Sequence, residues 1–255
     1  MKITRAVVPS LFTVLNIFCG FSSLLHTADG DYMLASWFIM LAAIFDVLDG
    51  VMARITKSSS DFGVEFDSLS DVVSFGAAPA FMVYRLQLHS LNGLGILISS
   101  MPLILGALRL ARFNAQLVGY DKEYFKGLPI PASALVICSF VRFYYQAGIG
   151  LGGAEATVLP PLVVIVSFLM VSTVKYDTLP GFSRKGIKRH PVRFTVGVVA
   201  LTVIVVTGGQ ALFPVLAFYL ATGPLRYVVR FVQHGFHPAV KEEEEKDPEI
   251  TGVDV

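Results

Sequence analysis

Two short stretches of the chain place four aspartates at helical intervals among apolar residues. Asp46 and Asp49 lie three positions apart, and Asp67 and Asp71 lie four positions apart, so each pair falls on one face of a helix. A short loop would join the two helices at one side of a bundle. We therefore expect the four carboxylates to converge in one cleft.

Four converging carboxylates require cations. Like charges repel, and burying a carboxylate without a partner costs several kcal/mol. Arg54 alone cannot balance this charge. Hard oxygen ligands without His or Cys suit Mg²⁺ or Mn²⁺ and suit zinc or copper poorly. The sequence thus predicts two such ions about 3.5–4 Å apart, an arrangement that transfers phosphoryl groups. Aspartates that cap helices or pair with arginines are the structural alternative.

The elements that must position these aspartates are membrane helices. Of the 255 residues, 54% are hydrophobic and 15% are charged, against roughly 25% charged in a soluble domain. This composition excludes a soluble enzyme, a disulfide scaffold and a disordered chain. Apolar runs of about 20 residues cross a bilayer as helices. We predict an all-α, polytopic bundle with about eight transmembrane helices, over residues 7–26, 32–53, 66–86, 91–112, 129–148, 155–175, 193–209 and 211–231.

Basic residues predict the orientation of these helices. With the N-terminus in the cytoplasm, all of the 20 Lys and Arg residues except Arg85 and Arg142 fall on the cytoplasmic side. Both termini are then cytoplasmic. Residues 1–235 form one integral-membrane domain in this interpretation, and the acidic stretch 236–255 is predicted to be a disordered cytoplasmic tail. A net charge of +1 without a basic block gives no indication of nucleic acid binding.

The residues around the aspartates resemble the signature of the CDP-alcohol phosphatidyltransferases. The pattern Asp46-x2-Asp49-Gly50-x2-Ala53-Arg54-x8-Gly63-x3-Asp67-x3-Asp71 matches that signature position for position. Segments 9–16, 67–79, 109–114 and 125–131 resemble the bacterial and archaeal members that use L-serine as acceptor. The resemblance is strong up to about residue 145, and the last helices are matched only by hydropathy.

The resemblance implies a reaction and a fold. Family members catalyse the attack of an alcohol on CDP-diacylglycerol, which releases CMP. They are homodimers in the cell membrane, and their active site faces the cytoplasm. It implies a six-helix catalytic core followed here by two C-terminal helices. The metal ligands would be Asp46, Asp49, Asp67 and Asp71, with Mg²⁺ or Mn²⁺ as the ions. Asp71 would also be the base that takes the proton of the attacking hydroxyl.

The resemblance also implies a nucleotide site. The cytidine diphosphate would be lined by Gly50, Ala53, Arg54 and Gly63. Asn16, inside the first predicted helix, either touches the nucleotide or bonds to a neighbouring helix.

Candidates for the acceptor site lie at the inner end of the fourth predicted helix. Arg109, Arg112 and Asn114 could hold the carboxylate of the acceptor or a lipid phosphate, although ordinary flanking of a membrane helix by basic residues explains them as well.

Serine is the expected acceptor for two reasons, the resemblance and the charge of the site. At the positions that correspond to residues 67–72, the enzymes that use glycerol phosphate resemble the pattern Asp-Pro-x-x-Asp-Lys. This chain has Ser68 in place of the proline and Val72 in place of the lysine. The missing lysine leaves too little positive charge for a phosphorylated acceptor. A sister enzyme that uses glycerol phosphate, inositol phosphate or choline stays open, as does a divalent-cation transporter.

Overall fold

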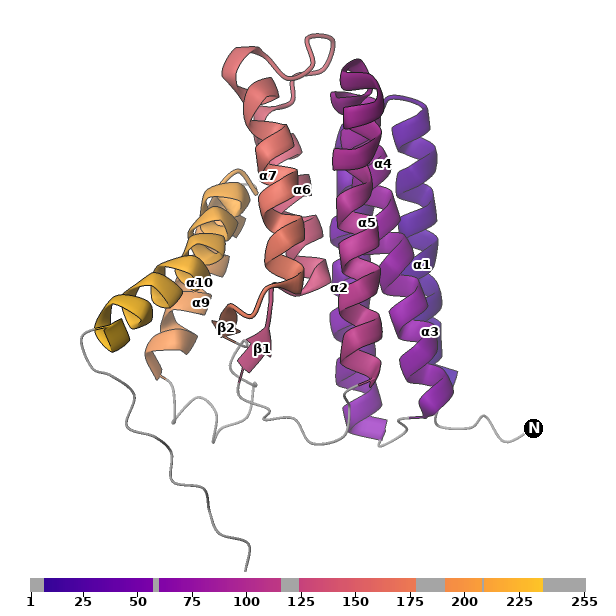
Figure 1. The fold of residues 1–255 in the computed structure, drawn as a ribbon. Helices are drawn as coiled ribbons and strands as arrows, with labels where there is room; N and C mark the ends of the chain where they lie inside the picture. Colours follow the sequence, from indigo (N-terminus) through magenta and orange to yellow (C-terminus); the bar gives the residue numbers. More distant parts are fainter. Residues whose placement is uncertain (1–6, 57–59, 116–123, 178–190, 208, 236–255) are drawn as a thin grey trace, which may run out of the picture.

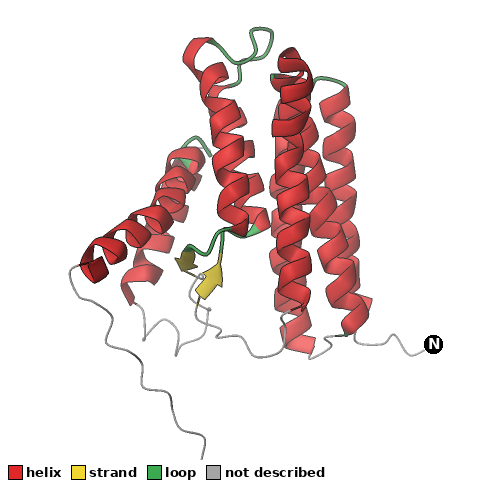
Figure 2. Cartoon of the chain, viewed as in Figure 1, coloured by secondary structure: helices red, strands yellow, loops and turns green. Residues whose placement is uncertain are grey.

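The computed structural model describes residues 7–56, 60–115, 124–177, 191–207 and 209–235 (Figures 1 and 2). Within these ranges the chain is helical apart from short connections and one small ribbon. The helices of the first part are α1 (Val7–Ala28), α2 (Tyr32–Thr56), α3 (Asp61–Asp71), the π-helix η1 (Val72–Ala77), α4 (Ala78–Leu86), the 3₁₀ turn η2 (Leu88–Leu91) and α5 (Asn92–Ala115). The later helices are α6 (Ile130–Tyr144), α7 (Gly153–Val171), α9 (Pro191–Val206) and α10 (Leu212–Gly235).

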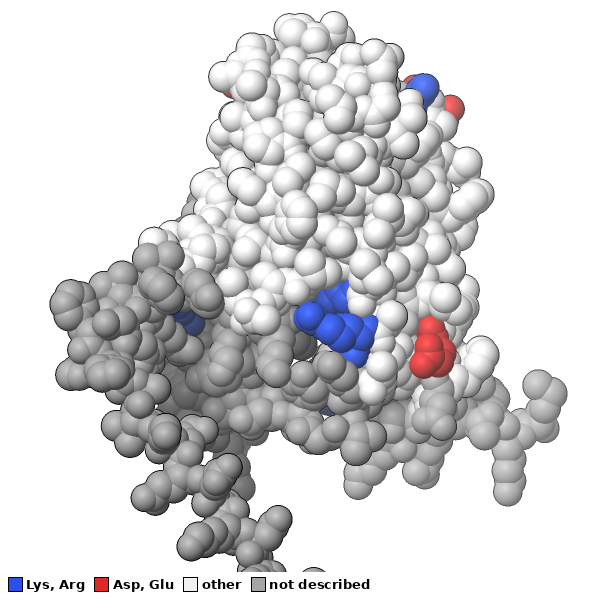
Figure 3. Space-filling model, viewed as in Figure 1, with Lys and Arg blue, Asp and Glu red and all other residues white. Residues whose placement is uncertain are grey.

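Long apolar helices confirm a multi-pass membrane bundle. Four of the described helical stretches are long and apolar enough to cross a membrane: Ser10–Ala28, Tyr32–Thr56, Leu88–Ala115 and Gly153–Val171. Ile130–Tyr144 and Leu212–Arg226 are shorter apolar helices. On the face shown in Figure 3, the coloured charged side chains of the described residues lie toward the two ends, and the band between them is uncharged.

The helices are arranged in two groups. In Figure 1, α1 to α5 stand side by side, α6 and α7 lie next to them, and α10 leans obliquely against α6. The buried core joins the groups through large apolar side chains such as Ile39, Phe75, Met82, Ile137 and Phe140. Large side chains on the outer faces, such as Phe18 and Leu97, are exposed, as expected of helices that face lipid.

Two predicted helices end earlier than their apolar runs. Residues 129–148 were expected to be one span, but α6 ends at Tyr144, because Tyr145 adopts an extended conformation with φ −73° and ψ 129°. Gly148 and Gly150 adopt positive φ values of 84° and 86° in the turn that follows. Residues 155–175 were expected to be another, but α7 ends at Val171. The helix predicted at residue 66 starts earlier, because the Ser60 side chain caps α3 by accepting a hydrogen bond from the Gly63 N–H at 3.1 Å.

A two-stranded ribbon lies among the described residues and was not predicted from hydropathy. Strand β1 (Tyr124–Lys126) pairs antiparallel with β2 (Lys175–Asp177), and Phe125 lies opposite Tyr176. The all-α prediction is confirmed for the bundle. The ribbon lies in the connections between helices, apart from Lys175, which was predicted to end a span. Each strand is too short, and too close to an apolar run, to stand out in a window of about 20 residues.

Hydroxyl groups tie α1 to the helix that carries two of the aspartates. The Ser70 hydroxyl donates to the Thr13 carbonyl at 3.2 Å, and the Ser74 hydroxyl donates to the Asn16 carbonyl at 2.9 Å. Gly20 lets the backbones approach closely, since a Cβ there would lie 2.7 Å from the Cα of Ser74. Small residues that allow close approach are typical of packed membrane helices.

Candidate metal centre

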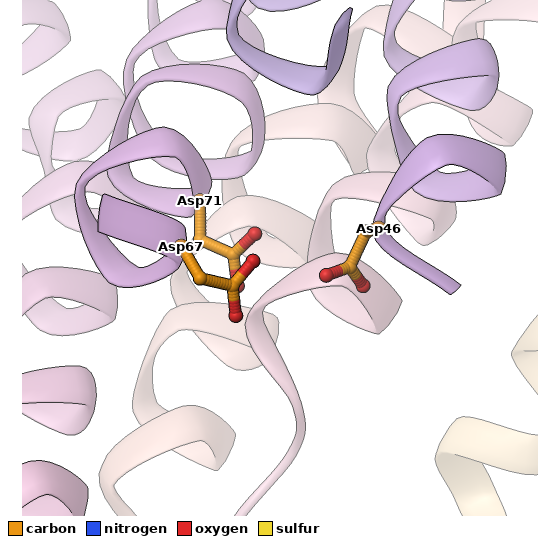
Figure 4. Close-up of side chains that lie close together, drawn as sticks. All are labelled: Asp46, Asp67 and Asp71. Atoms are coloured by element: carbon orange, nitrogen blue, oxygen red, sulfur yellow. The ribbon is translucent and has the colours of Figure 1, made fainter. Parts of the chain in front are cut away.

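Three carboxylates meet at the centre of the candidate site. Asp46 comes from α2, and Asp67 and Asp71 come from successive turns of α3. One oxygen of each lies within 4.8 Å of the others, and Figure 4 shows Asp67 and Asp71 extending from one helix toward Asp46 on another. Asp71 is buried and the other two are half-buried. The predicted convergence is confirmed for these three side chains.

The helix changes its winding directly after Asp71. Residues Val72–Ala77 form a π-helix between α3 and α4, and its Ser74, Phe75 and Gly76 are buried. A π segment has more residues per turn than an α-helix and frequently marks a functional site. It offsets the register between the aspartates before it and the apolar face of α4 after it, so that both can face the interior.

The fourth aspartate stands beside the cluster and has a partner of its own. Asp49 is not one of the three clustered carboxylates, although its charge acts on both Asp46 and Asp67. Its Oδ2 accepts a hydrogen bond from the Thr13 hydroxyl of α1. The expected four-carboxylate cluster is thus three carboxylates at ligand distance and a fourth held one helical turn away.

Asn16 of α1 makes the equivalent contact with the cluster. Its Nδ2 donates to Oδ1 of Asp71 at 3.3 Å, which matches the expectation that it bonds to a neighbouring helix. Sequence reasoning did not single out Thr13, but its spacing of three residues from Asn16 places both side chains on one face of α1. That face is the signal that could have found it.

Unpaired acceptors in the site fit a bound cation. Asn16 Oδ1 and Asp67 Oδ1 are both buried and have no hydrogen-bond partner among the described residues. Buried polar atoms in native proteins are nearly always paired, and an unpaired one costs about 1–3 kcal/mol. Both orphaned atoms are oxygens beside clustered carboxylates, which is the donor chemistry that Mg²⁺ and Mn²⁺ prefer.

The four residues predicted to line the nucleotide lie where α2 ends and α3 begins. Arg54 is exposed and its Nε donates to the Gly50 carbonyl at 2.8 Å. Gly50 borders open space, since no heavy atom lies within 4 Å of a Cβ built there. Ala53 is half-buried, and the Gly63 N–H is engaged by the Ser60 cap. Gly50, Ala53 and Arg54 share the last turns of α2, and Gly63 lies in the first turn of α3. The binding role of the four residues stays a prediction.

The three acceptor candidates at the end of α5 differ in what they contact. Asn114 Nδ2 donates to the Ser68 hydroxyl at 3.0 Å, next to Asp67. The exposed Arg112 donates to the Val171 carbonyl at the end of α7 at 3.4 Å. Arg109 is buried, its Nε has no hydrogen-bond partner among the described residues, and it lies within electrostatic reach of Asp71. Of the three, Arg109 is the one with a buried donor left open.

Comparisons with known proteins agree with the motif. A family model described as CDP-alcohol phosphatidyltransferase matches residues 6–170. The chain is 34% identical over 227 residues to the CDP-diacylglycerol–serine O-phosphatidyltransferase of Helicobacter pylori, covering 88% of this chain and 92% of that protein. It is 37% identical over 185 residues to the archaetidylserine synthase of Methanothermobacter thermautotrophicus, covering 71% and 74%. Among solved structures it matches the phosphatidylinositol phosphate synthase of Mycobacterium tuberculosis with CDP-DAG bound, at a TM-score of 0.48 and 18% identity, covering 67% and 82%.

Proposed function

The chain belongs to the CDP-alcohol phosphatidyltransferase family, and on that premise we propose that it transfers the phosphatidyl group of CDP-diacylglycerol to L-serine, giving phosphatidylserine and CMP. The observation that carries this proposal is the meeting of Asp46, Asp67 and Asp71 at the positions of the family motif. The two curated relatives above are both named for serine, which supports the choice of acceptor. Family membership argues against the cation transporter that the aspartates alone left open.

Divalent cations fit the carboxylate cluster. Asp46, Asp67 and Asp71 would hold Mg²⁺ or Mn²⁺. Asp49, one helical turn after Asp46 on α2, would be the fourth ligand. When bound, the ions supply positive charge to the diphosphate of the donor and to the departing CMP. The protein itself then has two tasks, which are to position both substrates and to accept one proton.

Asp71 is the proposed proton acceptor. The serine oxygen forms a bond to the lipid-bearing phosphorus, the bond from that phosphorus to the CMP oxygen breaks, and the hydroxyl proton passes to Asp71. The hydrogen bond from Asn16 orients this carboxylate. Arg109 would hold the carboxylate of serine, while Arg112 and Asn114 fix the surrounding helices.

An acceptor series tests the proposed function. Purified protein is incubated with CDP-diacylglycerol and Mg²⁺, and CMP release and the lipid product are followed with L-serine, glycerol 3-phosphate, inositol phosphate or choline. We expect CMP release with serine and little with the other acceptors. A preference for glycerol 3-phosphate or inositol phosphate would be consistent with family membership but would contradict serine as the acceptor.

We further propose that all eight helical passes, counting α3, η1 and α4 as one, cross the membrane with both termini and the aspartates on the cytoplasmic side. Arg85 and Arg142 lie in the last turns of α4 and α6, the helix ends predicted to face outward. Residues 1–235 would form one membrane domain that pairs as a homodimer. The acidic tail, 236–255, and most of the loop before α9 lie outside the described residues.

Cysteine labelling in intact cells tests the orientation. The native Cys19 and Cys138 are buried, so background labelling by an impermeant maleimide is expected to be low. Ser90→Cys, on the exposed turn η2, should label from outside, and Lys185→Cys should label only after lysis. Labelling of position 185 in intact cells would contradict the proposed orientation and favour the opposite one.

A further inference from the structure

Asn16 presents a buried amide to the carboxylate cluster. Its side chain is fully buried in α1, and its Nδ2 donates to Oδ1 of Asp71 at 3.3 Å. An ionised carboxylate only accepts hydrogen bonds, so the nitrogen end of the amide must face Asp71. The oxygen end of the same amide is therefore left for another partner.

The described residues around this amide offer no donor to its oxygen. Oδ1 of Asn16 is buried and has no hydrogen-bond partner among them. The Ser70 and Ser74 hydroxyls donate to the backbone carbonyls of Thr13 and Asn16, at 3.2 and 2.9 Å. The Thr13 hydroxyl donates to Asp49. Each hydroxyl has one proton to give, so the partner of the amide oxygen is either a water molecule or a cation.

A cation fits this position better than a water molecule. Asp71, which Asn16 bonds, belongs to the cluster in which one oxygen each of Asp46, Asp67 and Asp71 lies within 4.8 Å of the others (Figure 4). Oδ1 of Asp67 is buried and unpaired there too. Water can donate protons to such atoms but brings no net charge. A divalent ion binds the oxygens and also offsets the repulsion between the carboxylates.

The packing of α1 holds the amide in place before any ion binds. α1 packs along α2 and α3, and the Ser74 hydroxyl bonds to the backbone of Asn16 itself. Gly20, one turn further along, allows this approach, since a Cβ there would lie 2.7 Å from the Cα of Ser74. A ligand that is already ordered loses little freedom when it binds.

A neutral ligand also suits the charge of the cluster. Its three carboxylates already bring three negative charges, and the diphosphate of the proposed donor must approach the same place. Mg²⁺ requires an octahedral set of oxygen ligands. An amide oxygen fills one of these positions and adds no further negative charge that would repel the diphosphate.

We propose that Oδ1 of Asn16 is a direct ligand of the divalent ion in the carboxylate cluster, while its Nδ2 orients Asp71. The proposal rests on the proposed function for the presence of the ion, and deepens it by adding a neutral ligand from a helix outside the aspartate motif. α1 is then part of the metal site and not only a support for it.

Metal titration in the absence of substrates tests the proposed ligand. Mn²⁺ is titrated into purified protein in detergent and followed by calorimetry. Asn16→Leu removes the amide at similar volume and should raise the Kd for Mn²⁺ about tenfold to a hundredfold. Mg²⁺ should then raise the Tm of this variant less than that of the wild type. An unchanged Kd would overturn the proposal.

Ser23→Ala is the matched control for the loss of a buried polar group. Ser23 lies two turns further along the same face of α1, and its hydroxyl is also buried and unpaired among the described residues. Its removal should leave the Kd for Mn²⁺ within about twofold of the wild type, on the standing uncertainty of such values. A rise equal to that of Asn16→Leu would mean that any buried polar group of α1 matters, and would contradict a specific ligand.

Asn16→Asp separates ligation from hydrogen bonding and keeps the size of the side chain, so the test does not depend on whether Asn16→Leu folds. Aspartate retains an oxygen at this position and loses the N–H that bonds Asp71. If the oxygen is a ligand, the Kd for Mn²⁺ should equal or fall below that of the wild type. If Asn16 acts only as a donor to Asp71, the Kd should rise, and the proposal would be wrong.

A thiol at position 16 gives a direct signature of ligation. Thiolates bind soft ions such as Cd²⁺, and the bond produces a charge-transfer absorption band. Asn16→Cys with Cd²⁺ should show this band, whereas the wild type, whose Cys19 and Cys138 are buried, should not. Adding Asp67→Asn should weaken the band, because the thiolate and the carboxylates share one ion. Absence of the band in Asn16→Cys at saturating Cd²⁺ would exclude direct ligation from position 16.

These readouts separate the proposal from the function on which it rests, because none of them needs serine or CDP-diacylglycerol. Wild-type protein that binds no Mn²⁺ would overturn both the ligand and the metal-dependent reaction. Normal Mn²⁺ binding with an unchanged Kd in Asn16→Leu would overturn the role of Asn16 alone. The predicted metal-binding changes without CMP release from serine would support the ligand and contradict serine as the acceptor.

Discussion

The region around the aspartates and the region around α10 are held together by different kinds of contact. At the first, α1 meets α2 and α3 through polar side chains, with Thr13 on Asp49, Asn16 on Asp71 and Ser70 on a backbone carbonyl. At the second, α6, β2 and α10 meet through aromatic rings packed edge-to-face or tilted around Phe213 and Tyr176. In lipid, hydrogen bonds between helices contribute only about 0.6 kcal/mol on average.

This difference in contacts suggests two roles: the polar contacts orient the carboxylates, and the aromatic contacts hold α10 against the bundle. A hydrogen bond has a preferred direction, so the polar contacts fix how each carboxylate points. Ring packing depends on area and shape, and it fixes where a whole helix lies. We therefore expect changes in the polar region to affect turnover with little loss of stability, and changes in the aromatic region to do the reverse.

The largest effect should come from removing the divalent cation. Excess chelator should abolish CMP release, and Mg²⁺ or Mn²⁺ should restore it, because Asp46, Asp67 and Asp71 otherwise repel one another. A thermal unfolding measurement in detergent provides a second readout, since added Mg²⁺ should raise the Tm of the wild type. Full turnover in chelator would remove the metal from the proposed reaction.

The next largest effect is expected for Asp67→Asn. Loss of one carboxylate of the cluster should lower kcat on the order of 10³-fold, and Mg²⁺ should no longer raise the Tm. Glu65→Gln, an exposed acid on the same helix, is the matched control and should keep near wild-type turnover. Equal losses in the two variants would mean that general negative charge, and not the cluster, matters.

Asp71→Asn separates proton removal from metal binding. If Asp71 mainly accepts the proton, this variant should lose about 10²–10⁴-fold in kcat while it retains CDP-diacylglycerol binding. Asp67→Asn should weaken that binding as well. Calorimetric titration of both variants with donor distinguishes them, and equal loss of binding would leave Asp71 as a ligand only.

A smaller effect is expected for the positioning contact on α1. Thr13→Val removes the hydroxyl that donates to Asp49 and should lower kcat about tenfold, with a Tm close to that of the wild type. Thr13→Ser should restore activity. Ser22→Ala is the control, because the Ser22 hydroxyl donates within α1, to the Phe18 carbonyl. A similar loss in both variants would contradict a specific role for Thr13.

The smallest effect on turnover is expected in the aromatic region. Gly223→Ala would drive a methyl group into the Tyr176 ring and should cost about 1–3 kcal/mol of stability, seen as a lower Tm, while kcat falls only slightly. Gly197→Ala on α9 is the control, because no heavy atom lies within 4 Å of a Cβ built there. Loss of kcat without loss of stability in Gly223→Ala would break the division between the two regions.

The sequence predicted the part of the site that depends on helical spacing. Asp46, Asp67 and Asp71 converge because each lies on a predictable face of a helix near a short connection. The contact of Thr13 with Asp49 was not predicted, since it depends on how α1 packs against α2, and helical spacing says nothing about that packing.

The fold was predicted where apolar residues follow one another without interruption. It was missed where backbone conformation or hydrogen bonding, and not hydropathy, determines the structure. The bundle follows from long apolar runs, but α6 ends inside the predicted run, where Tyr145 adopts an extended conformation. The ribbon depends on backbone bonding between segments some fifty residues apart. The local composition of Val72–Ala77 does not mark the π-helix that follows Asp71.

Gly20 shows how far the candidate site reaches along α1. It has no side chain to offer a ligand, yet any side chain there would collide with the backbone of Ser74. The helices would separate at the point where Asn16 and Thr13 meet the carboxylates. In a random-mutagenesis screen for enzyme activity, substitutions at position 20 should therefore lower activity as much as substitutions of the aspartates. The positions that tolerate no substitution would then extend along α1 well beyond the residues that touch substrate.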